Sequence, residues 1–177
     1  MKTVGEMTIG ELAAFVCTHL EKNGINVVLS GGACVSLFTE NEYQSFDLDF
    51  IENVVTSRKR IREVLQKIGF IEEHRYYKHP DTDFFLEFPP GPLSIGDEPV
   101  REIMEKEFST GVLRLLSPTD CVKDRLTAYY HWNDQPGLEQ AILVCLDNKV
   151  DLDEVERWSI NEGLKNKFEI FKKRLNR

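Results

Sequence analysis

Long apolar runs are absent from this sequence. None approaches the roughly 18–20 consecutive apolar residues that a helix needs to cross a bilayer. Residues 1–6 also lack the apolar stretch of a signal peptide. We therefore expect a cytoplasmic protein with no membrane segment.

Cysteine is scarce, and no Cys-x-x-Cys pair occurs. The histidines His19, His74 and His79 lack partners at the spacing of zinc ligands, so we do not expect a zinc site. The cysteines lie in mostly apolar stretches with helical spacing, which indicates buried free thiols. They are Cys17, Cys34, Cys121 and Cys145.

Basic residues are too few for a protein that binds duplex DNA tightly and nonspecifically. Lys and Arg number 22 against 30 Asp and Glu, which gives a net charge of −8. The C-terminal segment 165–177 is the exception, with six basic residues and one acidic residue. A basic helix of this kind is usually solvated, and the alternative is that it binds a protein partner.

The remaining composition is that of a folded protein. The chain has 177 residues, of which 41% are hydrophobic and 29% are charged, so it can bury one core. No internal repeat or low-complexity segment interrupts it. We expect one domain, or one domain with a helical extension.

Helices and strands are predicted to alternate in the first part of the chain. Apolar residues recur at helical spacing in some segments and alternate with polar residues in others. In order, we expect a helix from a capping box at residues 8–11 to residues 23–24, a strand over 25–30, a short helix over 33–38, a strand over 46–50, a helix over 61–68, and strands over 70–77 and 84–88 joined by a turn at 79–82.

A proline-rich segment, residues 89–92, opens a loop that extends to about Pro99. A last strand is predicted over 112–116, and residues 117–120 are typical of a helix start. Helices are then expected over 119–132, 138–147 and 151–175. The sequence thus predicts an α+β fold, a mixed sheet flanked by helices, with an α/β domain over 1–116 and a C-terminal helical portion over 117–177.

A glycine turn follows the first predicted strand. Gly31-Gly32 lets the backbone approach a ligand, and the helix after it offers free N–H groups and the positive end of its dipole to a phosphate. Such a turn is also common for purely structural reasons. The sequence alone leaves both interpretations open.

Two carboxylates lie on one face of a predicted strand. Asp47 and Asp49 are two residues apart, so their side chains point the same way from Cα atoms about 7 Å apart. Like charges this close favour a cation between them, and Mg²⁺ prefers oxygen ligands. The alternative is an edge strand with a solvated polar face.

Glu87 is the third acid of interest. It lies between Leu86 and Phe88 in a predicted strand whose apolar residues pack inward. If this strand is a neighbour of the strand with Asp47 and Asp49, three carboxylates converge. Such a group can hold two metal ions for an in-line displacement at phosphorus.

These features, in this order, resemble the nucleotidyltransferase superfamily with the DNA polymerase β-like fold. The pattern is a strand ending in Leu29-Ser30-Gly31-Gly32, then Asp47-Leu48-Asp49-Phe50, then Leu86-Glu87-Phe88. It covers about residues 25–88. Residues 124–134 also resemble the helical portion of small bacterial members, some of which are toxin–antitoxin components.

The resemblance implies a Mg²⁺-dependent enzyme that moves a nucleoside monophosphate from an NTP such as ATP to an acceptor and releases pyrophosphate. The acceptor is a small molecule, a protein or RNA. Asp47, Asp49 and Glu87 would be the catalytic residues and metal ligands, and Glu87 would help to deprotonate the acceptor. The implied nucleotide-binding residues are Ser30, Gly31, Gly32 and Arg125.

The sequence departs from the family pattern at the turn. Gly32 stands where many members have serine, and Ser30 cannot be assumed to replace that hydroxyl. The gap of residues 33–46 is also slightly long. A non-catalytic binding or regulatory module, with a toxin-like partner on the basic C-terminal helix, is therefore the alternative.

Other polar residues have several interpretations. Arg125 and Lys123 are placed either on a triphosphate or in ion pairs with Asp120 and Asp124. Arg75 and Lys78 either face the acidic site or are solvated. At the end of the helix over 119–132, Trp132 could stack on the nucleotide base, and His131 and Asp134 could bind the acceptor. The alternative is that these residues only cap the helix end and pack against the fold. Two other enzyme classes are disfavoured. A metal-dependent nuclease would have lysine where this chain has Pro89, and the chain is short for a glycosyltransferase.

Overall fold

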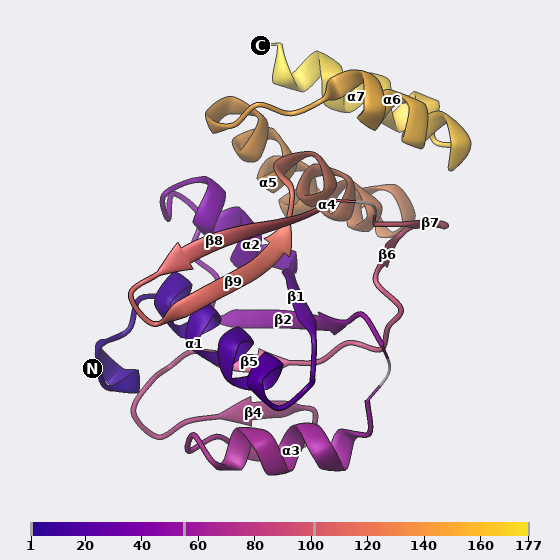
Figure 1. The fold of residues 1–177 in the computed structure, drawn as a ribbon. Coiled ribbons are helices and arrows are strands. Elements are labelled where there is room, and N and C mark those ends of the chain that lie inside the picture. The colour runs from indigo at the N-terminus through magenta and orange to yellow at the C-terminus, as the bar shows by residue number, and fades with distance from the viewer. Residues whose placement is uncertain (1, 55, 101, 177) are drawn as a thin grey trace.

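The computed structural model of this chain describes residues 2–54, 56–100 and 102–176 (Figure 1). The fold is α+β, as predicted, with a mixed seven-stranded sheet and four helices at the C-terminal end. The elements are η1 (Val4–Glu6), α1 (Ile9–Lys22), β1 (Val27–Ser30), α2 (Gly31–Phe38), β2 (Asp47–Glu52), α3 (Arg58–Gln66), β3 (Ile71–Glu73), β4 (Tyr76–Lys78), β5 (Phe85–Glu87), β6 (Ser94–Ile95), β7 (Glu98–Pro99), β8 (Ile103–Phe108), β9 (Gly111–Leu116), α4 (Pro118–Trp132), α5 (Gln135–Asp147), α6 (Leu152–Asn161) and α7 (Lys165–Leu175).

The large sheet has the strand order β3-β4-β5-β2-β1-β9-β8. β2 is antiparallel to β1 and parallel to β5, and β1 is parallel to β9. The strands that carry the predicted acids, β2 and β5, are therefore adjacent and lie inside the sheet. β6 and β7 form a separate two-stranded hairpin.

Local sequence signals explain several element boundaries. The capping box at the start of α1 is present, because the Glu11 N–H donates to the Thr8 hydroxyl and the Thr8 N–H donates to the Glu11 carboxylate. The Ser117 hydroxyl accepts the Asp120 N–H at the start of α4, with Pro118 in the first turn. Along β2, half-buried and buried residues alternate, as the predicted period of two requires.

The C-terminal helices pack on the α/β part of the chain. α4 and α5 contact α2, and Figure 1 shows α4 to α7 stacked on one side of the large sheet. Buried apolar residues from both parts form one continuous cluster. β9 ends at Leu116 and α4 begins at Pro118, but the division into two units at this point remains a prediction.

Two predicted elements are each split in the structure. The strand expected over 70–77 is a hairpin of β3 and β4, because His74 adopts a positive φ of 58° and reverses the chain. The helix expected over 151–175 is two helices, α6 and α7, separated at Gly163, which has a φ of 74°. Both predictions were wrong because one residue in the left-handed region interrupts the regular backbone.

Other strands were not predicted at all. The loop expected from Pro89 to Pro99 contains β6 and β7. The edge strand β8 pairs with β9 along its whole length, but its exposed residues Glu105, Lys106 and Glu107 hide the alternation of a strand. α5 begins at Gln135, earlier than the predicted 138, because the Asp134 side chain caps it.

The cysteines are free thiols, as predicted. Cys17, Cys34 and Cys121 are buried, and Cys145 is half-buried. Each lies in a helix, respectively α1, α2, α4 and α5. Among the described residues, no helix is both long and apolar enough to cross a membrane.

Candidate active site

The three predicted acids lie together on one face of the large sheet. In the parallel pair of β2 and β5, Asp49 is in register with Glu87, and Asp47 lies two residues earlier on the same face as Asp49. One carboxylate oxygen from each of the three residues lies within 4.8 Å of the others. The predicted convergence is observed, and we call Asp47, Asp49 and Glu87 the acidic triad.

The acidic triad is held in surroundings that disfavour its charge. Burial and, to a smaller extent, the negative charge of Glu87 raise the pKa of Asp47 to about 6. Burial also raises the pKa of Asp49 to about 7, with added repulsion from Asp47 and Glu87. The buried Oδ1 atom of Asp47 accepts no hydrogen bond from the described residues. Three crowded carboxylates and an unsatisfied oxygen fit a hard divalent cation.

This electrostatic arrangement predicts a pH-dependent response to metal. The folded chain keeps a proton on Asp47 up to about pH 6 and on Asp49 up to about pH 7, whereas the unfolded chain releases both near pH 4. These groups therefore make the metal-free protein less stable as the pH rises from about 4 to 7. A bound cation replaces the protons. Thermal unfolding should therefore show a larger stabilisation by Mg²⁺ or Mn²⁺ at about pH 8 than at about pH 5. Equal stabilisation at both pH values would contradict this account.

Gly31 makes room for the acidic triad. It is the first residue of α2 and has a φ of 69°, a conformation that favours glycine. A Cβ atom on residue 31 would overlap Oδ2 of Asp49. The first turn of α2 therefore lies directly against a triad carboxylate, which a residue with a side chain would not allow.

Ser30 is hydrogen-bonded to β2, whereas Gly32 lies beside two hydroxyl groups. Ser30 is buried, and its hydroxyl donates to the backbone carbonyl of Asp49 at 3.3 Å and does not cap α2. A side chain on Gly32 would begin 3.3 Å from the Tyr43 hydroxyl and 3.2 Å from Ser45 Oγ. Two hydroxyls thus lie beside Gly32, although the sequence provides none within the turn itself.

Tyr43 and Ser45 were not singled out from the sequence. The Ser45 hydroxyl donates to the Asp47 carbonyl at 3.0 Å and accepts the Asp47 N–H at 3.3 Å, so it fixes the start of β2. The signal for Ser45 was a serine just before a predicted strand, because a serine hydroxyl can bond the backbone two residues ahead. Tyr43 lies in a loop, and nothing in the sequence indicated its approach to Gly32.

Arg125, on α4, influences the acidic triad through its charge. Its guanidinium donates to the Asp124 carboxylate at 2.6 and 3.1 Å and to Gln140 Oε1 at 3.4 Å. Its positive charge opposes the rise in the pKa of Asp49, so the side chain acts on the site from α4. The structure shows the ion pair with Asp124, and the contact of Arg125 with a triphosphate stays a prediction.

Arg75 faces the acidic triad from the turn between β3 and β4. Its Nε atom lies 3.3 Å from Oε1 of Glu87, and its side chain is 65% exposed. Lys78, on the same hairpin, instead pairs with Glu73 at 2.6 Å. From the sequence, both residues could either face the acidic site or be solvated. Of these two residues, Arg75 faces the site and Lys78 does not.

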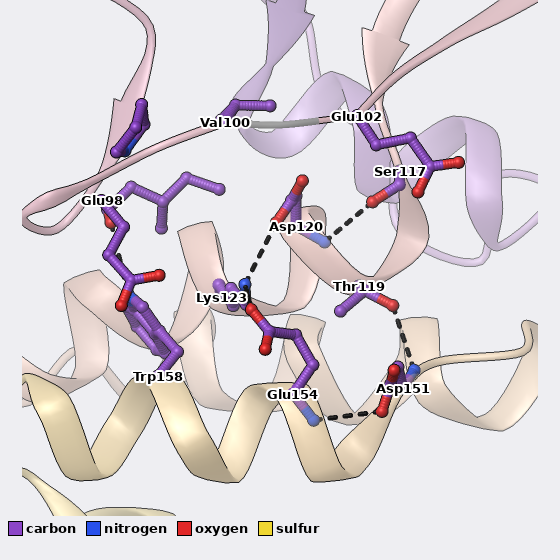
Figure 2. Close-up of a pocket in the computed structure, with 12 residues that line it drawn as sticks. Glu98, Val100, Glu102, Ser117, Thr119, Asp120, Lys123, Asp151, Glu154 and Trp158 are labelled. Atoms are coloured by element: carbon purple, nitrogen blue, oxygen red, sulfur yellow. Dashed lines mark hydrogen bonds and ion pairs between the residues drawn. The ribbon is translucent and has the colours of Figure 1, made fainter.

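A separate cavity of about 330 Å³ lies between the β6–β7 hairpin, α4 and α6 (Figure 2). Lys123 is buried at its centre, where Nζ lies 2.6 Å from Glu154 and 3.4 Å from Asp120. No residue of the acidic triad lines this cavity. Lys123 therefore links α4 to α6 through ion pairs. The sequence had left open whether Lys123 forms ion pairs or binds a triphosphate, and the structure shows the ion pairs.

The end of α4 and the basic segment have mainly intramolecular contacts. The Asp134 carboxylate accepts the Gly137 N–H at 3.0 Å, whereas His131 and Trp132 are exposed. Lys167 donates to the backbone carbonyls of Tyr129 and Tyr130 at 2.9 and 2.7 Å. Other basic residues of α7 pair with acids of neighbouring helices, Lys172 with Glu156 at 3.6 Å and Arg174 with Glu139 at 3.7 Å.

Comparisons with known proteins identify the fold. No protein-family model matches the chain, and no curated protein matches its sequence. A nucleotidyltransferase-like antigenic protein from Paracoccidioides brasiliensis superposes with a TM-score of 0.57 over 77% of this chain and 74% of its own, at 14% identity.

Two structures of ANT(2″)-Ia are also similar. A solution structure of this antibiotic-resistance factor covers 95% of this chain and 94% of its own, with a TM-score of 0.52. A crystal structure in complex with adenylyl-2″-tobramycin covers 87% and 92%, with a TM-score of 0.51. Both are 15% identical to this chain. At this identity the likeness shows the fold, which is nucleotidyltransferase-like, as the sequence predicted.

Proposed function

We propose that this chain is a divalent-metal-dependent nucleotidyltransferase that transfers a nucleoside monophosphate from an NTP to an acceptor hydroxyl. The observation that carries the proposal is the acidic triad, with oxygens within 4.8 Å of one another and Asp49 packed against Gly31. The likeness in fold to ANT(2″)-Ia supports it. We also propose a cytoplasmic location, where NTPs are available.

The triad residues fit a metal such as Mg²⁺, and Asp47, Asp49 and Glu87 would hold it. When bound, the ion supplies charge neutralisation at the reacting phosphate. The unsatisfied buried oxygen of Asp47 and the raised pKa values of Asp47 and Asp49 are the observations that favour this use of the site. A cluster of carboxylates with satisfied oxygens and ordinary pKa values would need no metal, because solvent alone would stabilise its charge.

The remaining chemistry belongs to the chain's own residues. Backbone N–H groups at Gly31 and Gly32, at the positive end of α2, bind the triphosphate. The acceptor oxygen forms a bond to the α-phosphorus, the bond from that phosphorus to its bridging oxygen breaks, and pyrophosphate leaves. The acceptor proton passes to Glu87. Catalysis is mainly positioning and charge stabilisation.

A small molecule with a hydroxyl group is the first acceptor to test. ANT(2″)-Ia was solved with an adenylylated aminoglycoside, and it covers nearly the whole of this chain. The net charge of −8 favours a neutral or cationic acceptor and disfavours RNA. A protein hydroxyl is the next acceptor to test.

The proposal is tested by following the α-phosphate. The protein is incubated with Mg²⁺, each of the NTPs labelled at the α-phosphate, and a panel of amino sugars or a cell extract. We expect label in an acceptor product and one pyrophosphate for each label transferred, both lost with Glu87→Gln. Label released only as free nucleoside monophosphate, or transfer that persists in Glu87→Gln, would contradict the proposal.

A non-catalytic module with the same fold is the second candidate. The crowding of Gly32 by Tyr43 favours it, because the ring narrows the approach to the first turn of α2. Calorimetry with Mg²⁺ and NTP separates the two candidates, since only the enzyme requires tight binding of the triphosphate. The proposed toxin-like partner on the basic C-terminal helix remains a prediction, as does the relation to toxin–antitoxin systems.

A further inference from the structure

Arg75 is the exposed cation in direct contact with the acidic triad. Its Nε atom lies 3.3 Å from Glu87, and its charge also opposes the rise in the pKa of Asp47. Arg125 acts on the triad too, but its guanidinium is committed to Asp124 and Gln140. The two cations near the site therefore differ in exposure, because the Arg75 side chain is 65% exposed and the Arg125 side chain is 21% exposed.

The backbone of Arg75 is fixed, whereas its guanidinium lies at the surface, where it contacts Glu87 and donates to the Tyr76 hydroxyl at 2.5 Å. Arg58 of α3 donates to the Arg75 carbonyl at 3.0 Å, and the positive φ of His74 sets the turn. The register places Tyr76 opposite Glu87, and Glu87 opposite Asp49. The guanidinium lies over the Tyr76 ring at 4.8 Å and keeps most of its surface in solvent.

An exposed ion pair of this kind does little for the stability of the fold. Solvent screens the attraction between the two charges, and holding a long side chain in one geometry costs entropy. A divalent cation on the acidic triad needs an oxygen of Glu87, the carboxylate that Arg75 contacts. The metal and the guanidinium therefore compete for one group, and the long side chain of Arg75 is the partner that can leave.

We propose that Arg75 is a phosphate-binding residue that rests on Glu87 and moves to the triphosphate when a metal ion takes that carboxylate. This inference depends on the proposed function and adds a residue to it. A guanidinium binds two phosphate oxygens through parallel N–H donors, which suits it to the anionic group that arrives with the metal. Arg75 would then stabilise the charge that accumulates on the leaving pyrophosphate.

The test compares Arg75→Gln with the wild-type protein in two binding measurements that need no turnover. Titration with Mn²⁺ alone, followed by the electron paramagnetic resonance of the free ion, should show binding about two- to five-fold tighter in Arg75→Gln, because the competing cation is gone. Calorimetry with inorganic tripolyphosphate and Mn²⁺ should show binding about ten-fold weaker or more, because the phosphate contact is lost.

Two further variants serve as controls. Arg75→Lys keeps the charge without the paired donors, so its Mn²⁺ affinity should match the wild type while tripolyphosphate binds more weakly. Lys78→Gln removes a charge from the same hairpin, where Lys78 pairs with Glu73, and should change neither affinity.

The outcomes separate this inference from the proposed function. Wild-type protein that binds no Mn²⁺ would overturn the metal site, and with it both proposals. If the wild type binds Mn²⁺ but Arg75→Gln binds it no more tightly, only the role of Arg75 is overturned. Tighter Mn²⁺ binding with unchanged tripolyphosphate affinity would also overturn it, because Arg75 would then compete with the metal without binding phosphate.

Discussion

Asp49→Asn is expected to lower nucleotidyl transfer by about 10³-fold or more while the protein stays folded. Asp49 lies between its triad partners, in register with Glu87 and on the same face as Asp47. The amide keeps the shape of the side chain but removes a charge that the metal requires. Steady-state rates measured with a saturating acceptor and labelled NTP provide the comparison.

The stability of Asp49→Asn shows whether its loss of activity results from unfolding. Burial raises the pKa of Asp49 to about 7, so a neutral amide should leave the thermal midpoint at about pH 8 unchanged or higher in the absence of metal. Asp83→Asn is the matched control, because Asp83 precedes β5, is exposed and lies outside the acidic triad. Full activity in Asp49→Asn, or equal losses in both variants, would contradict the role of Asp49.

Gly31→Ala is expected to lower transfer by about 10²-fold and to destabilise the fold by about 1–2 kcal/mol. The activity loss follows from the added Cβ, which would displace the Asp49 carboxylate. The stability loss follows from the φ of 69°, which alanine adopts only with strain. Denaturant unfolding and transfer kinetics measure the two effects separately.

Gly163→Ala is the control that separates backbone strain from the contact of the added Cβ with Asp49. Gly163 has a φ of 74°, but among the described residues no heavy atom beyond its own and its chain neighbours' lies within 4 Å of where its Cβ would be. It should therefore show a similar loss of stability with unchanged transfer. If Gly31→Ala behaved in the same way as Gly163→Ala, the close contact between α2 and Asp49 would have no catalytic importance.

Local signals in the sequence were sufficient for much of the site. The alternation of Asp47 and Asp49 with apolar residues placed both acids on one strand face, because side-chain direction in a strand has a period of two. The glycine turn was predicted because Gly31 and Gly32 directly follow a predicted strand, and the structure adds that Gly31 leaves room for the Asp49 carboxylate. These features depend on neighbours in sequence, which a pattern can reveal.

Features that depend on strand pairing were less accessible. Arg75 reaches Glu87 only because residues 70–77 form a hairpin, and no proline or glycine marks its turn at His74. The Tyr43 ring meets Gly32 through a loop conformation that no periodicity describes. Gly163, by contrast, is visible in the sequence as a helix breaker within 151–175, and its positive φ ends α6 there.

The central claim is that Asp47, Asp49 and Glu87 form one metal site beside Gly31. Crystals soaked in Mn²⁺ test it most directly, through an anomalous difference map collected on the long-wavelength side of the iron edge. The account predicts a peak bonded to oxygens of all three carboxylates, which disappears in Asp49→Asn. A map with no peak there, or a peak only at the acids around Lys123, would contradict it.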